Sequence, residues 1–211
     1  MEDLVNGEGR LSVIPVNAGT DPARPSTSST FSSPSTSISD LELNGTPHTD
    51  NRLLNRGDIF ICIKGFSTDG HQFIPDAIAR GASLIVCEQE CQPGLPSIRV
   101  TDTRKAAALL ARLYFNCPSS SFRLVGVTGT NGKTSTSLII FEALRRLGYK
   151  AGWIGTLGYM INDGHFPTGH TTPDIMELNR IFASMRDAEV SYVIMEVSSH
   201  AIALDRIYGI D

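Results

Sequence analysis

Apolar residues in the second half of the chain follow the order strand, glycine-rich loop, helix. The apolar run at 122–127 predicts a buried parallel strand, and residues 133–147 place apolar side chains at helical spacing before Gly148, a natural residue for a helix C-terminus. That stripe consists of Leu138, Phe141 and Leu144, widened by Ile140 and Leu147. The pattern further predicts strands at 150–155 and 191–197, a loop over 156–174 and a helix beginning at Pro173.

The first half repeats the alternation of strands and helices. It predicts strands at 59–63, 83–87 and 98–100, and helices at 75–82 and 101–115. In the longer helix we expect Ala107, Leu110 and Leu113 or Tyr114 to face inward. Strands that alternate with helices indicate an α/β fold, and residues 116–121 are predicted as a linker between two such units.

Composition divides the chain into three segments. Residues 1–37 are predicted as a disordered tail, because 11 of the 14 residues at 26–39 are serine or threonine. An organellar transit peptide is an alternative, although acidic residues lie upstream and arginines are few. Residues 38–118 are predicted as one domain and 122–211 as a second, which is short for a doubly wound sheet and therefore interpreted as the first part of a larger domain.

Charge and composition exclude several classes of protein. The net charge is −4 and no basic stripe is present, so we expect no nucleic-acid partner. No apolar run approaches the roughly 18 to 20 residues of a membrane span, and the acidic N-terminus lacks a secretory signal, so we expect a cytoplasmic protein. The four cysteines include only one close pair, Cys87 and Cys91, which is weak evidence for zinc.

The loop GVTGTNGKTS at 126–135 carries the strongest chemical signal. Its glycines allow the backbone to approach a ligand and leave N–H groups free for an anion, while Lys133 adds a positive charge and Thr134 a hydroxyl. At a helix N-terminus, this combination suits a polyphosphate with a divalent metal. Val127 stands where the strict P-loop pattern has glycine, and the glycine spacing does not fit a dinucleotide fold. A glycine turn without a ligand is the alternative.

Glu196 closes the strand predicted at 191–197. The carboxyl ends of parallel strands face the crevice in which the phosphates would lie. A carboxylate there can hold Mg²⁺ together with Thr134. The alternative is a glutamate that caps the next segment or faces solvent.

Four stretches, in this order, carry a resemblance to a known family. They are TDNRLLNRGDIFICIKGFSTDGHQFIPDAIARGA, GVTGTNGKTS, HTTPD and MEVSSHAIALDR. From about Ile38 to Ile210 the chain resembles the Mur ligases, and most of all the MurE type. The resemblance implies a small N-terminal α/β domain that binds the UDP end of the substrate. It is followed by the first part of a P-loop central domain with a mostly parallel sheet.

The resemblance also implies roles for individual residues. The ATP phosphates would lie against Gly129, Thr130, Asn131, Gly132, Lys133, Thr134 and Ser135. Mg²⁺ would bind Thr134 and Glu196, and Lys133 and Glu196 would be the catalytic pair. The uridine would lie near Thr49, Asn51, Arg52, Phe66, Ser67 and Thr68, where Asn51 departs from the usual serine. The muramoyl-dipeptide would contact His170, Thr171, Thr172, Ser198 and Arg206.

Simpler structural roles compete with several of these assignments. Thr172 before Pro173 is a good helix N-cap, Ser198 is another, and Arg206 could be a solvated helix residue. Arg52 could pair with Asp50 or Asp58. Outside the assigned residues, Asp69 and His71 are better explained as turn residues than as catalytic groups.

The implied reaction is ATP-dependent amide formation through an acyl phosphate. The substrates would be UDP-N-acetylmuramoyl-L-alanyl-D-glutamate and a diamino acid, diaminopimelate or lysine. Family members continue into a segment with a carbamylated lysine and a C-terminal domain for the amino acid, so we expect these 211 residues to be unable to complete the reaction. Alternatives are a MurF-type ligase, a folylpolyglutamate- or cyanophycin-like ligase, or a non-catalytic module that binds a UDP-sugar or a nucleotide. The oligomeric state stays open.

Overall fold

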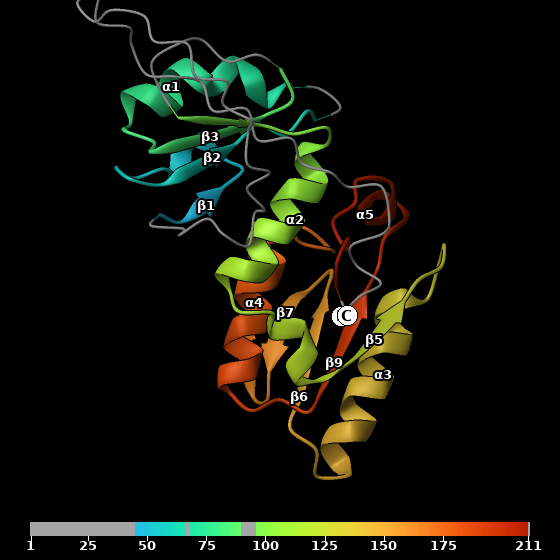
Figure 1. The fold of residues 1–211 in the computed structure, drawn as a ribbon. Helices are drawn as coiled ribbons and strands as arrows, with labels where there is room; N and C mark the ends of the chain where they lie inside the picture. Colours follow the sequence, from blue (N-terminus) through green and yellow to red (C-terminus); the bar gives the residue numbers. More distant parts are fainter. Residues whose placement is uncertain (1–44, 66–67, 90–95, 211) are drawn as a thin grey trace, which may run out of the picture. The chain divides into compact units, whose positions relative to one another are not determined.

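The computed structural model describes residues 45–65, 68–89 and 96–210 (Figure 1). The predicted tail at 1–37 lies outside these residues. The chain divides into two compact units, Met1–Ala106 and Ala107–Asp211, and each is described by itself. The domain boundaries expected from the sequence, 38–118 and 122–211, stay predictions.

The N-terminal unit is built on a four-stranded sheet of order β1-β2-β3-β4, in which all neighbours are parallel. Phe60 and Ile85 of the sheet pack with Ala77 of a covering helix, which is why the central strands are continuous apolar runs. Burial raises the pKa of the Cys62 thiol in this core to about 12, so Cys62 packs as a neutral hydrophobe. The elements are β1 (Pro47–His48), η2 (Asn51–Leu53), β2 (Ile59–Ile61), η3 (Gly70–Phe73), α1 (Ile74–Ala79), β3 (Leu84–Cys87) and β4 (Ser97–Arg99). Helix α2 (Thr103–Tyr114) begins in this unit and continues past its boundary at Ala106.

The inward face of α2 is shorter than the sequence predicts. Ala107 and Leu110 are buried as expected, but Leu113 and Tyr114 are 44% and 38% exposed, so the expectation for the last turn is wrong. The buried stripe ends at Ala111, one turn before the helix does. Periodicity predicts which side of a helix is apolar and does not predict how far along the helix a neighbour covers it.

The C-terminal unit is a five-stranded sheet of order β5-β9-β6-β7-β8, flanked by helices. Strands β5, β9 and β6 are parallel, whereas β7 and β8 continue the sheet as an antiparallel hairpin. The elements are η4 (Pro118–Ser121), β5 (Arg123–Val127), α3 (Lys133–Arg146), β6 (Ala151–Gly155), β7 (Gly158–Ile161), β8 (Gly164–Phe166), α4 (Ile175–Asp187), β9 (Tyr192–Glu196) and α5 (Ser199–Ala203).

The central strands of this unit are buried on both faces. Along β9, Val193 and Met195 join the core cluster that contains the apolar side of α4, while Ile194 joins the cluster that contains Phe141 of α3. Alternate side chains of one strand therefore serve two different cores. A strand covered by a helix on each face carries apolar residues at every position, as the run at 191–197 indicates.

Three expectations for this unit are wrong. The segment 156–174, predicted as a loop, contains the β7–β8 hairpin, whose turn places Asn162 in the left-handed region with φ of 51°. Leu147 does not widen the buried stripe of α3, because it is 72% exposed. The strand before the glycine loop is parallel but not buried throughout: β5 pairs only with β9 among the described strands, and Val125 is exposed.

The start of α4 also differs from the prediction. The helix begins at Ile175 rather than Pro173, and its N-cap is Asp174, whose Oδ1 accepts hydrogen bonds from the N–H groups of Met176 and Glu177. The interpretation of Thr172 as the N-cap is therefore wrong. The Thr172 hydroxyl is free for the contacts described below.

Candidate functional site

The glycine-rich loop spans residues 128–132 and connects β5 to α3. Gly129 has φ of +148° and Gly132, the N-cap of α3, has φ of +79°, which are backbone conformations that favour glycine. A Cβ added at Gly132 would meet no atom within 4 Å. Conformation rather than crowding requires glycine there. The first N–H groups of the fourteen-residue helix α3 have no acceptor within the helix, which is the arrangement that favours an anion.

Lys133 and Thr134 begin α3 and point to different partners. The Lys133 Nζ donates to the carbonyl oxygen of Gly129 at 2.7 Å, so the lysine folds back over its own loop. The Thr134 hydroxyl donates to Oε2 of Glu196 at 3.0 Å. Residues 134 and 196 therefore meet from a helix N-terminus and a strand end. That they share a metal stays a prediction.

Glu196 ends the central strand β9 and has no exposed surface. The alternative in which it faces solvent is therefore wrong. Besides Thr134, its carboxylate accepts a hydrogen bond at Oε1 from the backbone N–H of Thr156, at 3.0 Å, and lies with Oε2 3.2 Å from the Thr156 hydroxyl. A buried carboxylate needs such donors, because without them burial would be costly.

Thr156 was not expected in the site. It directly follows β6, next to Gly155, where an added Cβ would lie 2.1 Å from the Glu196 Oε1. A sequence signal for it exists: a hydroxyl residue after a buried parallel strand lies on the same edge of the sheet as the glycine loop and Glu196. Predicting 156–174 as one loop hides that signal.

The residues expected to hold the dipeptide continue the same hydrogen-bond network. The Thr171 hydroxyl lies 3.2 Å from that of Thr156, and the Thr172 hydroxyl donates to the backbone carbonyl of Glu196 at 2.9 Å. The Thr172 hydroxyl also accepts from the N–H of Ser198 at 3.1 Å, and Arg206 Nη1 donates to the Thr172 carbonyl at 2.9 Å. Of the five residues, Thr172 contacts Glu196 directly, and Thr171, Ser198 and Arg206 join the network through Thr156 or Thr172.

Of the simpler structural roles considered for Ser198 and Arg206, the structure supports the first and not the second. Ser198 is indeed an N-cap, since its hydroxyl accepts from the N–H of Ala201 at the start of α5. Arg206, in contrast, is tied to Thr172 rather than left in solvent. His170, the fifth residue, enters the described hydrogen bonds through its carbonyl oxygen, which accepts from the Thr168 hydroxyl at 2.9 Å.

The chemistry of these side chains fits ATP with Mg²⁺. Mg²⁺ prefers oxygen ligands and keeps several waters beside one or two protein groups. The hydroxyl of Thr134 and the carboxylate of Glu196, 3.0 Å apart beside a helix N-terminus, are such a pair. The described residues contain no group of three or more His, Cys, Asp or Glu side chains that could hold a metal alone, and a site completed by phosphates and water needs none.

In the N-terminal unit, the residues expected near the uridine follow β1. Arg52 makes a two-pronged ion pair with Asp50, with Nη2 and Oδ2 2.6 Å apart, so the simple pairing considered for Arg52 is the one observed. The Arg52 hydrogen bond lowers the pKa of Asp50. Asn51 donates to Asp76 at 2.7 Å, and Thr49 precedes this cluster. Thr68 precedes η3, whereas Phe66 and Ser67 lie outside the described residues.

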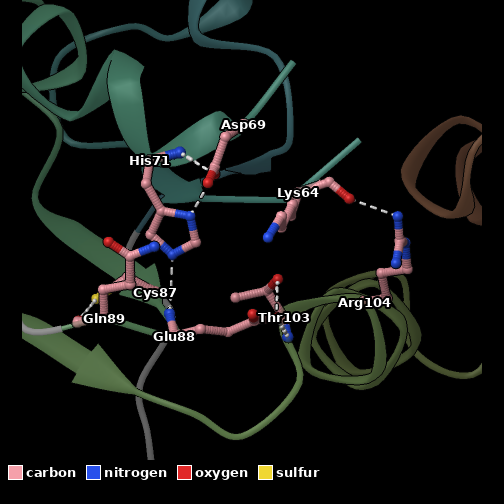
Figure 2. Close-up of polar contacts among 8 residues, drawn as sticks. All are labelled: Lys64, Asp69, His71, Cys87, Glu88, Gln89, Thr103 and Arg104. Atoms are coloured by element: carbon pink, nitrogen blue, oxygen red, sulfur yellow. Dashed lines mark hydrogen bonds and ion pairs between the residues drawn. The ribbon is translucent and has the colours of Figure 1, made fainter. Parts of the chain in front are cut away.

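Asp69 and His71 form a structural network (Figure 2). Asp69 caps η3 by accepting from the His71 N–H, and its Oδ1 lies 2.6 Å from the imidazole Nδ1. The other ring nitrogen, Nε2, accepts from the N–H of Glu88 at 3.0 Å, so Nδ1 carries the proton. Glu88 in turn accepts from the N–H and hydroxyl of Thr103 at the start of α2. With both nitrogens occupied, His71 connects η3, β3 and α2, as expected of a turn residue.

In this unit a parallel strand leads through a glycine loop into a helix, and a carboxylate lies at the end of the neighbouring strand. These features define the class of α/β proteins with a phosphate-binding loop. Residues 127–211 match the Mur ligase middle domain, and residues 48–115 match the Mur ligase family, catalytic domain. The chain belongs to the Mur ligase family.

Curated proteins similar to the chain include UDP-N-acetylmuramoyl-L-alanyl-D-glutamate–2,6-diaminopimelate ligases. That of Clostridium perfringens is 44% identical over 163 residues, covering 76% of this chain and 34% of the relative. That of Bacteroides thetaiotaomicron is 44% identical over 178 residues, covering 83% and 37%. The chain thus spans about a third of the length of these relatives.

Solved structures agree on the fold. A UDP-N-acetylmuramoyl-L-alanyl-D-glutamate–2,6-diaminopimelate ligase superimposes with a TM-score of 0.65 at 22% identity, covering 81% of this chain and 37% of that one. MurF from Acinetobacter baumannii gives a TM-score of 0.50 at 23% identity, covering 72% and 30%. In the described part of the chain, no helix combines the length and the apolar character that crossing a membrane requires.

Proposed function

We propose that this chain forms the UDP-substrate-binding and ATP-binding parts of a MurE-type ligase. The full reaction would join 2,6-diaminopimelate to UDP-N-acetylmuramoyl-L-alanyl-D-glutamate. The relatives at 44% identity carry that activity in their names. The observation that carries the proposal is the contact between Thr134, at the N-terminus of α3, and the buried Glu196 at the end of β9.

Each part of the site has a definite task in this proposal. The loop N–H groups and the α3 N-terminus would hold the phosphates, and Lys133 would leave the Gly129 carbonyl to contact them. Thr134 and Glu196 would hold Mg²⁺. Bound ATP with Mg²⁺ supplies the phosphoryl group that activates a carboxylate.

The acceptor dipeptide would lie beside the ATP site. Thr172 is hydrogen-bonded to Glu196, and Thr171, Ser198 and Arg206 are connected to it through Thr156 or Thr172, which would keep the two substrates close. Positioning and charge neutralisation account for most of the catalysis in such a transfer, so no side chain has to act as a nucleophile.

Replacement of Lys133 tests the proposed phosphate site. We expect Lys133→Ala to weaken ADP binding in the presence of Mg²⁺ by about tenfold or more, roughly 1.4 kcal/mol, because a charge-assisted contact is lost. Isothermal titration calorimetry measures the change. Lys150→Ala is the matched control, since it removes an exposed lysine paired with Glu189. Equal ADP affinity in the wild type and Lys133→Ala would contradict the assignment.

A further inference from the structure

Thr156 contacts Glu196 through both its backbone and its side chain. The backbone N–H donates to Oε1 at 3.0 Å, and the hydroxyl lies 3.2 Å from Oε2. Gly155 makes this approach possible, because any Cβ at that position would collide with Oε1. The turn after β6 is therefore fitted closely against the carboxylate.

The direction of these hydrogen bonds follows from the acceptor. A carboxylate oxygen can only accept, so the Thr156 hydroxyl gives its one proton to Glu196. The Thr171 hydroxyl, 3.2 Å away, then donates to the oxygen of Thr156. Glu196 thus receives three donors from two residues: the hydroxyl of Thr134 and both polar groups of Thr156.

These donors differ in what happens to them when a metal binds. In the proposed function, Thr134 is a ligand of Mg²⁺, and a hydroxyl oxygen that faces a cation turns its proton away from it. Thr156 is not a ligand of Mg²⁺ in the proposed function. It is the residue that can continue to hold Glu196 in both states.

We propose that Thr156 is a positioning residue for the metal ligand Glu196, a role that rests on the proposed function of this site. Its N–H fixes Oε1, and its hydroxyl orients Oε2 toward the glycine loop. Groups that orient a metal ligand typically change metal affinity by about 10–100-fold when they are removed.

Three variants separate this role from a general structural one. Thr156→Val removes the hydroxyl and keeps the β-branched shape and the backbone N–H. Thr156→Ser keeps the hydroxyl. The matched control is Thr168→Val, which removes a hydroxyl bonded to the His170 carbonyl at 2.9 Å in the segment that follows β8.

The experiment is calorimetric titration of the 211-residue chain with ADP, once with Mg²⁺ and once with EDTA. We expect Thr156→Val to reduce the strengthening of ADP binding by Mg²⁺ about tenfold and to change the affinity in EDTA less than twofold. Thr156→Ser should restore the Mg²⁺ effect, and Thr168→Val should leave it unchanged.

Each of the other outcomes contradicts a different part of the proposal. If Thr156→Val retains the full Mg²⁺ effect, or loses affinity equally with Mg²⁺ and with EDTA, Thr156 does not position the metal ligand. If the wild-type chain binds ADP equally with Mg²⁺ and with EDTA, the assignment of Glu196 and Thr134 to the metal is wrong, and the role of Thr156 falls with it. If the wild-type chain binds no ADP at all, the proposed function itself is overturned.

Discussion

Gly155 sets the distance between the end of β6 and the carboxylate of Glu196. An added Cβ would lie 2.1 Å from Oε1 and 2.4 Å from the ring of Trp153, both of which are buried. We expect Gly155→Ala to lower the free energy of unfolding by about 1–3 kcal/mol, because a well-packed core must move to admit a methyl group. Urea denaturation measures the change.

The control for that substitution is Gly169→Ala, in the segment before α4. A Cβ there would meet nothing within 4 Å. We expect its unfolding free energy to stay close to that of the wild type. If Gly155→Ala were as stable as Gly169→Ala, the close fit around Glu196 would be contradicted.

Asp69 makes the N-terminal unit sensitive to acid. The backbone and side-chain hydrogen bonds from His71 hold the pKa of Asp69 below its ordinary value of 3.8. Its contribution to stability is therefore present above pH 3.8 and is lost as the pH falls through the lowered pKa. We expect Asp69→Asn to lower the urea midpoint at pH 7 and to differ less from the wild type at pH 3.

The amide of that variant can still accept the His71 N–H, so the comparison isolates the charge of Asp69. Asp163→Asn, which alters an exposed carboxylate at the β7–β8 turn of the other unit, serves as the control. If the difference in urea midpoint between the wild type and Asp69→Asn stayed constant from pH 7 to pH 3, the charge of Asp69 would contribute nothing to stability.

Helix α4 depends on a single capping side chain. Asp174 Oδ1 accepts from two N–H groups of the first turn, at 2.9 and 3.0 Å. We expect Asp174→Ala to cost about 1 kcal/mol, because both donors lose their partner. The melting temperature should fall, whereas Asp174→Asn, which can still accept these bonds, should retain most of the stability.

If Asp174→Ala and Asp174→Asn melted at the same temperature, the cap would contribute nothing.

The strands and helices that carry the site could be predicted because each has a strong apolar pattern. Residues 122–127, 133–147 and 191–197 are long enough for their period to be read, and parallel strands bring their carboxyl ends to one edge. The contact between Thr134 and Glu196 follows from that geometry. Their assignment to Mg²⁺ stays a prediction.

The parts that could not be predicted depend on contacts between elements. The hairpin strands β7 and β8 have four and three residues, too short to show a clear alternation, although the two turn residues between them, Asn162 and Asp163, are of types common in hairpin turns. Thr156 follows β6, which pairs with β9, but predicting 156–174 as one loop hides its place beside Glu196. In the same way, the exposure of Leu147 and Tyr114 depends on where a neighbouring element ends.

At the scale of the whole molecule, the two units have different parts of the proposed task. The N-terminal unit holds the residues expected near the uridine, where Arg52 and Asn51 are already paired with Asp50 and Asp76. The C-terminal unit holds the phosphate loop and the carboxylate. The chain spans about a third of the length of the curated relatives that it matches.

Because β9 lies in the centre of the sheet, we expect the two sides of the proposed ATP site to differ in how fast their amide hydrogens exchange with solvent. This strand is hydrogen-bonded to β5 on one side and to β6 on the other, and its side chains are buried in two cores. Amide hydrogens of such a strand exchange with solvent only when the whole unit unfolds, whereas those of a surface loop exchange through small local openings. We therefore expect the amide hydrogens of β9, which carries Glu196, to exchange more slowly than those of the glycine loop.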